Sequence, residues 1–162
     1  MNLERGTEML NPTELSAEDR AKLAKGLKAV MGDTYALYVK THGYHWNVTG
    51  PRFKALHELF MEQYTELWQA LDELAERIRA LGEFAPASSD EIASYATIKP
   101  DNGVPDAEDM INNLVRGHET IAKVAREGVD AAEQGDDVVT ADLLTQRAAA
   151  AEKAAWMLRA SV

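Results

Sequence analysis

One set of apolar residues follows steps of three or four without exception: Phe53, Leu56, Phe60, Tyr64, Leu67, Leu71, Leu74, Ile78 and Leu81. This spacing places them on one face of an α-helix, because an α-helix has 3.6 residues per turn. Pro51 suits the first turn of such a helix, and Gly82 suits its end. The segment therefore predicts an amphipathic helix of about 30 residues, roughly 45 Å long.

Similar patterns predict three further long helices, over about residues 16–45, 106–134 and 137–159. The spacing of Ser16 and Asp19 is that of a capping box, which begins a helix. The connection from Glu83 to Pro105 is too long for a tight turn and holds a short predicted helix. Four long helices with two short corners and one long middle connection favour an all-α four-helix bundle with a crossover.

The composition excludes several classes of protein. The 162 residues carry 17 basic and 27 acidic side chains, a net charge of −10, and include no cysteine. Disulfides, thiolate metal sites and a cysteine nucleophile are therefore excluded. No apolar run approaches the ~20 residues needed to cross a bilayer, and the N-terminus lacks the apolar core of a signal peptide. We expect one cytoplasmic domain over residues 16–162, preceded by a flexible tail over residues 1–15.

Three of the four histidines, His42, His45 and His57, bracket the corner between the first two helices. His45 lies six residues before Pro51 and His57 six residues after it, so antiparallel helices would bring both imidazoles to the same height. Neutral imidazoles placed in this way suit iron, zinc or copper. For each histidine alone, capping or packing a helix is the favoured interpretation, and for the pair across a corner packing and a metal site stand as equal alternatives.

Asp72 and Glu76 offer two carboxylates at i and i+4, a pair that can bind one ion or simply face solvent. Fifteen residues separate His57 from Asp72. This spacing puts them about 60° apart around the helix but roughly 22 Å apart along it, so they cannot share a metal within one chain. If two copies of the helix packed antiparallel about a two-fold axis near residue 65, the histidine of each would face the carboxylates of the other. The spacing therefore predicts a metal site between subunits.

The chain resembles the Dps family, the miniature ferritins of bacteria and archaea. The resemblance is carried by the run from Tyr44 to Pro51 (YHWNVTGP), followed by Phe53, Leu56, His57, Asp72, Ala75, Glu76, Arg77, Leu81 and Gly82. It implies a ferritin-like four-helix subunit with a short helix in the middle crossover. It also implies a hollow homododecamer of tetrahedral symmetry.

The resemblance further implies a function. Members of the family oxidise Fe(II), preferentially with hydrogen peroxide rather than oxygen, at ferroxidase centres on two-fold interfaces, and deliver Fe(III) to a mineral core. By motif position, His45 and His57 of one subunit and Asp72 and Glu76 of its partner would be the metal ligands, with Trp46 beside the metal in electron transfer. The implied role is iron storage and detoxification that protects DNA, with iron as the metal and zinc as a competitor.

One position near the implied centre departs from the family's pattern. Many members carry Asp or Glu four residues after the second histidine, and this chain has Met61 there. A thioether is a weak ligand for iron, so we expect the second iron position to be poor or occupied transiently. Glu62 is a candidate ligand only if it reorients.

His42 could add a ligand or bind zinc, although a hydrogen bond near the helix end is the favoured interpretation.

The acidic charge of the chain indicates whether it can bind DNA or attract metal cations. The segment from Met1 to Arg20 holds two basic residues against five acidic ones, so we do not expect direct DNA binding unless divalent cations bridge the two. An acidic shell could instead attract Fe(II) to its pores. By resemblance, Asp137 and Asp142 are the candidate pore residues, although Asp137 could instead cap the last helix.

Two other functions remain open from sequence. One is a nucleoid-associated, DNA-binding stress protein with a weak or vestigial metal site, which would need a basic tail. The other is a helical-bundle hydrolase that holds zinc with His42, His45 and His57. We expect His118 to be a satisfied core histidine, and Trp68 and Trp156 to be packing or interface residues.

Overall fold

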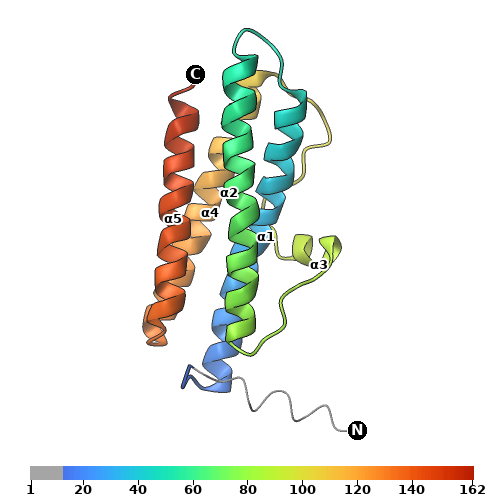
Figure 1. Cartoon of the computed structure of the whole chain (residues 1–162). Helices are drawn as coiled ribbons and strands as arrows, with labels where there is room; N and C mark the ends of the chain where they lie inside the picture. The colour runs from blue at the N-terminus through green and yellow to red at the C-terminus, as the bar shows by residue number, and fades with distance from the viewer. Residues whose placement is uncertain (1–12) are drawn as a thin grey trace.

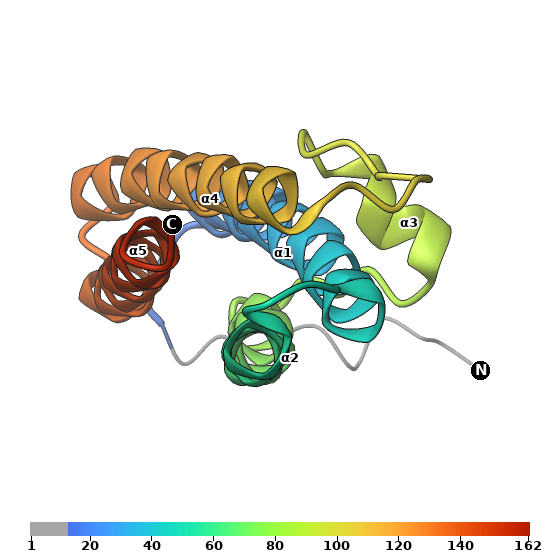
Figure 2. The same ribbon diagram turned by 90° about the horizontal axis from the view of Figure 1, so that it is seen from above.

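Four long helices and one short helix make up the part of the chain that the computed structural model describes, residues 13–162. They are α1 (Ala17–Asn47), α2 (Phe53–Ala80), α3 (Ser89–Ser94), α4 (Ala107–Gln134) and α5 (Val138–Arg159). Figures 1 and 2 show α1, α2, α4 and α5 as a bundle, with α3 outside it, next to α1. The predicted all-α bundle with a short helix in its crossover is confirmed. The predicted tail over residues 1–15 falls almost entirely outside the described residues and stays a prediction.

The helix ends follow local sequence signals. Ser16 caps α1 by accepting a hydrogen bond from the N–H of Asp19 at 3.1 Å, as the capping box predicted. At the end of α2, Gly82 takes a left-handed conformation with φ +85°. At the end of α4 the left-handed residue is Asp136, with φ +57°, and not Gly135. Aspartate is one of the few residues that tolerate this region, so both helices stop in the same way.

The core lies along the inward face of each long helix. Leu56, Phe60, Leu67, Leu74 and Ile78 of α2 are all buried, as their spacing predicted. They pack in two clusters with apolar residues of α1, α4 and α5. No described helix has the length and apolar character that crossing a membrane requires.

The crossover between α2 and α4 is held against α1 by a buried carboxylate. Asp33 is 1% exposed and accepts hydrogen bonds from the backbone N–H groups of Thr97 at 2.6 Å and Ile98 at 2.9 Å. The preceding residue, Gly32, allows the backbones to approach, because a Cβ there would lie 2.6 Å from the carbonyl carbon of Tyr95. This contact orders the crossover.

A pair of glycine substitutions in α1 tests the contact. Gly32→Ala should destabilise the protein by roughly 1–3 kcal/mol, because the added methyl group meets rigid backbone. Gly26→Ala should instead stabilise it by about 0.5–1 kcal/mol, since no atom lies within 4 Å of its Cβ position and alanine favours the helix. Urea unfolding at one protein concentration measures both. Shifts of the same sign would contradict the close approach at Gly32.

His118 lies in the core, but it is not satisfied there. Its side chain is 1% exposed, and neither ring nitrogen has a hydrogen-bond partner among the described residues. Burial, and then the positive charge of Arg147, lower the pKa of His118 to about 4. The imidazole is therefore neutral at pH 7, and its protonation is linked to loss of the fold.

This linkage predicts acid sensitivity with a defined sign. The folded pKa of His118, about 4, lies below the unfolded value of about 6.5, so stability is present above pH ~6.5 and is lost as the pH falls toward 4. The full loss is worth about 3 kcal/mol. His118→Leu should remove this contribution, which unfolding free energies measured at pH 7 and pH 4.5 would show. Identical pH dependence in the variant and the wild type would contradict the assignment.

Candidate metal centre

His45 and His57 face each other across the corner that joins α1 and α2. Their rings are stacked, with centroids 3.8 Å apart and planes inclined by 16°. His45 is 8% exposed and His57 is half-buried. The prediction that the two imidazoles lie at the same height is confirmed.

Each ring is oriented by a hydrogen bond to the other residue's backbone. Nδ1 of His45 lies 2.7 Å from the carbonyl oxygen of His57, and Nδ1 of His57 lies 2.7 Å from the carbonyl oxygen of His45. A carbonyl oxygen only accepts hydrogen bonds, so each Nδ1 must carry the hydrogen. A neutral imidazole then has its lone pair on Nε2, the nitrogen that is left to bind a metal.

The position of the pair at the end of α1 explains part of this arrangement. The last carbonyl groups of a helix lack partners within the helix. The carbonyl group of His45 is one of these, since α1 ends at Asn47. The ring of His57 satisfies it, so the metal donor is oriented by a bond that the helix end requires in any case.

The stacking predicts that each imidazole binds its own ion. A metal lies close to the plane of the imidazole that ligates it, about 2.1 Å from the nitrogen. An ion in the plane of one ring would lie far out of the plane of the other, because the planes are nearly parallel and the centroids are 3.8 Å apart. The pair is therefore suited to two neighbouring ions and not to one shared ion.

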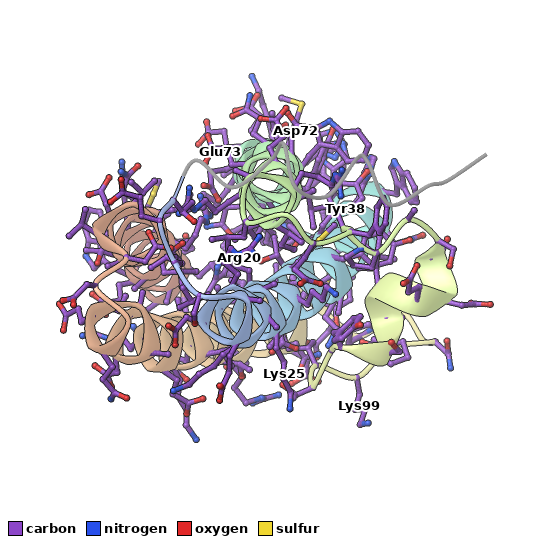
Figure 3. All side chains as sticks on the ribbon, turned by 90° about the horizontal axis from the view of Figure 1, so that it is seen from below. Arg20, Lys25, Tyr38, Asp72, Glu73 and Lys99 are labelled. Carbon is purple, nitrogen blue, oxygen red and sulfur yellow. The ribbon has the colours of Figure 1, made fainter. Side chains whose placement is uncertain are left out.

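The two candidate carboxylates are exposed on α2, without partners among residues 13–162. Asp72 and Glu76 form no hydrogen bond or ion pair with other described residues. Figure 3 shows Asp72 on the side of α2 that is turned away from α1. The axial separation of roughly 22 Å from His57 places this pair beyond reach of the imidazoles of the same chain. The chain thus presents two separate sets of donors, the imidazole pair at the corner between α1 and α2 and the carboxylates farther along α2.

The remaining candidates near the histidines do not complete a site within the chain. Met61 is 43% exposed and Glu62 is exposed, both about one turn beyond His57. Within residues 13–162, no group of three or more His, Cys, Asp or Glu side chains could hold a metal ion. His42 does not join the pair in one such group, so the described residues give no support to the three-histidine zinc site considered from the sequence.

His42 instead belongs to a cluster of aromatic rings. Its ring stacks on Tyr64, with centroids 3.9 Å apart, and lies 4.2 Å from the ring of Trp46. Its hydrogen-bond partner is the hydroxyl group of Tyr38, 3.2 Å from Nδ1, and not a group at the helix end. Burial, and then His45, lower the pKa of His42. The sequence pattern marked Tyr38 and Tyr64 only as residues of an apolar face.

The two candidate pore residues differ in surroundings. Asp137 is buried and caps α5, and Nη2 of Arg77 lies 2.9 Å from both of its carboxylate oxygens. Burial alone would raise the pKa of Asp137, but hydrogen bonds from Thr140 and Arg77 outweigh it and hold the pKa below its usual value. The structure supports the capping interpretation for Asp137. Asp142 is exposed and accepts a hydrogen bond from Gln146 at 2.7 Å.

Comparisons with known proteins show which proteins this chain is similar to. Residues 24–162 match the model of the ferritin-like domain family. The chain is 39% identical to an uncharacterised low temperature-induced protein of Nostoc sp., over 91% of this chain and 84% of that protein. It is 37% identical to DNA protection during starvation protein 2 of Bacillus anthracis, over 83% and 92%. The Dps protein of Vibrio cholerae, described as a ferritin-like diiron-carboxylate protein, has a TM-score of 0.88 at 33% identity and covers 93% of this chain and 94% of its own.

Separate binding by the two imidazoles predicts a stoichiometry. Each Nδ1 bonds to a backbone carbonyl that an alanine substitution keeps, so His57→Ala should leave His45 oriented. In a Co(II) titration followed by visible absorbance, that variant should lose one ion per subunit and keep the other. Lys54→Ala, an exposed change on the same helix, should keep both. Loss of all binding in His57→Ala would contradict separate ions.

Proposed function

The chain belongs to the Dps family of ferritin-like proteins, and we propose that it oxidises Fe(II) at centres formed between subunits and stores Fe(III) inside a hollow shell of about twelve copies. The observation that carries this proposal is the imidazole pair whose Nδ1 hydrogens are held by backbone carbonyls, leaving two Nε2 donors for metal. The diiron-carboxylate description of the Vibrio cholerae relative supports iron as the metal.

In the proposed centre, His45 and His57 of one subunit each hold an iron ion, and Asp72 and Glu76 of the partner subunit supply oxygen ligands. Mixed imidazole and carboxylate donors suit Fe(II), and oxygen donors suit the Fe(III) product. The two Fe(II) ions give one electron each, and hydrogen peroxide with two protons becomes two water molecules. Because both electrons are supplied at one centre, no hydroxyl radical is released, which is how such a protein would protect DNA chemically.

The charge of the chain supports removal of iron better than contact with nucleic acid. A net charge of −10 per chain opposes binding to phosphates.

We propose that the exposed carboxylate of Asp142 attracts Fe(II) at a pore, and that the protein works in the cytoplasm. If so, Asp142→Asn should slow iron uptake at low ionic strength, and unchanged uptake there would rule out the pore role. We also propose that Trp46, which is 66% exposed and has its ring 4.2 Å from that of His42, takes part in electron transfer at the centre.

Complementation between two inactive variants tests the shared centre. Apoprotein given Fe(II) without oxygen and then peroxide should develop ferric absorbance at the centre, and His57→Ala or Asp72→Ala should lose that activity. When the two variants are unfolded, mixed equally and reassembled, about half of the interfaces pair unlike subunits, and each such interface regains one of its two centres. The mixture should therefore recover about a quarter of the wild-type rate.

Two controls make the outcome decisive. Each variant unfolded and reassembled alone should stay inactive, and Glu83→Gln, remote from the proposed centre, should retain full activity. No recovery in a mixture whose sedimentation mass equals that of the wild type would contradict ligands from two subunits. A mass near a single 17.8 kDa chain for the wild type would contradict the shell.

A further inference from the structure

A series of easily oxidised rings leads from the candidate metal centre to the protein surface. The ring of Tyr64 lies 5.2 Å from that of His45. The ring of Tyr38 lies 6.3 Å from Tyr64 and 5.4 Å from Trp68. Trp68 is 60% exposed. Each ring thus has the next as an immediate neighbour, from an imidazole proposed to hold iron to an indole that is exposed on the single chain, on the outer face of α2.

The series crosses repeatedly between two helices. Tyr38 comes from α1, and Tyr64 and Trp68 come one turn apart from α2. Figure 3 shows Tyr38 between these helices. A second, shorter branch leaves Tyr64 through the stacked ring of His42 and ends at Trp46, 4.2 Å from His42. Tyr64 therefore joins both branches to His45, and the ring of His42 provides a second contact, 6.1 Å from His45 and 5.7 Å from Tyr38.

We propose that Tyr64, Tyr38 and Trp68 carry an electron to the metal centre when it holds a single Fe(II). This inference rests on the proposed function and concerns the state in which the second iron position, beside Met61, is empty. One Fe(II) gives hydrogen peroxide only one electron, which would release hydroxyl radical. The relay supplies the second electron from Trp68.

The step balances as written. Fe(II) becomes Fe(III), and Trp68 is oxidised by one electron and loses its indole N–H proton, becoming a neutral radical. The peroxide oxygen–oxygen bond breaks, and with that proton and one more from solvent two water molecules form. Tyrosine and tryptophan are suited to this transfer because their rings are the most easily oxidised in proteins. Phenylalanine has the same shape as tyrosine but a ring that is far harder to oxidise.

The chain contains its own control for oxidation by free radicals. Trp156 is 63% exposed, nearly as much as Trp68, but its ring contacts no other aromatic ring among residues 13–162. Radicals in bulk solvent would attack the two indoles according to their exposure. Electron transfer through the relay would oxidise Trp68 and leave Trp156 intact.

The test compares the two tryptophans by peptide mass spectrometry. Whole protein loaded without oxygen with one Fe(II) per subunit receives one equivalent of peroxide. The oxidised fractions of Trp68 and Trp156 are divided by the fractions obtained when metal-free protein is exposed to iron–EDTA and peroxide, which corrects for burial in the assembly. We expect the normalised ratio of Trp68 to Trp156 to exceed one several-fold in the wild type. In Tyr38→Phe it should fall to about one, while oxidation of Trp46 persists.

Further measurements distinguish a packing defect in Tyr38→Phe from a loss of electron transfer. Tyr38→Phe should leave the assembly mass, and ferric formation at two Fe(II) per subunit, unchanged, because the ring is kept. A normalised ratio of one in the wild type, or an unchanged ratio in Tyr38→Phe, would overturn the relay. Ferric absorbance measured in the same samples keeps the two proposals apart. If it develops without selective oxidation of Trp68, only the relay fails, and if it does not develop at all, the proposed function fails.

Discussion

Two hydrogen bonds, from the Nδ1 atoms of His45 and His57 to each other's backbone carbonyls, are the interaction on which the rest of the site depends. They require antiparallel helices, a short corner and equal distances from it, which α1 and α2 supply. These hydrogen bonds fix the tautomer of each imidazole and leave the lone pair of each ring on its Nε2 atom. Because the acceptors are backbone atoms, this orientation depends on the fold of the corner more than on any further side chain.

The bundle leaves the outer face of α2 free for a partner. The apolar face of this helix is used in the core, and polar groups also join it to α5 and the residues just before α5. Arg77 pairs with Asp137, and Glu66 pairs with Arg147. On the opposite face, Met61 and Trp68 are exposed together with the carboxylates Asp72 and Glu76. A long helix that carries one imidazole near one end and carboxylates toward the other is suited to pair with its own copy in antiparallel fashion.

Much of the fold could be predicted from the sequence because helix spacing and caps are local signals. The positions of Ser16, Pro51 and Gly82 gave helix ends close to those observed. The height of His45 relative to His57 also followed from counting residues across a corner. What could not be predicted depends on contacts between distant residues. Asp33 holds the crossover 64 residues away, and Arg77 neutralises Asp137 60 residues away, and neither pairing has a local signature.

The candidate donors of the proposed site could be selected from the sequence, but their arrangement could not. Spacing identified the histidines and the carboxylates, whereas ring stacking and tautomers depend on side-chain rotamers that periodicity does not encode. Asp137 shows the same limit, because its position suggested a pore as readily as a cap until burial and Arg77 were seen. Similarly, Tyr38 and Tyr64 occupied ordinary apolar positions in the pattern, and only their ring contacts relate them to the metal centre.

The central claim is that each imidazole binds its own iron and that the carboxylates come from another subunit. Anomalous diffraction at the iron edge, from crystals soaked in Fe(II) without oxygen, tests it most directly. The geometry predicts an anomalous peak at Nε2 of His57 and another at Nε2 of His45, the weaker one marking the position affected by Met61, with Asp72 and Glu76 of the partner subunit as ligands. A single peak shared by both imidazoles, or a site whose ligands all come from one chain, would contradict it.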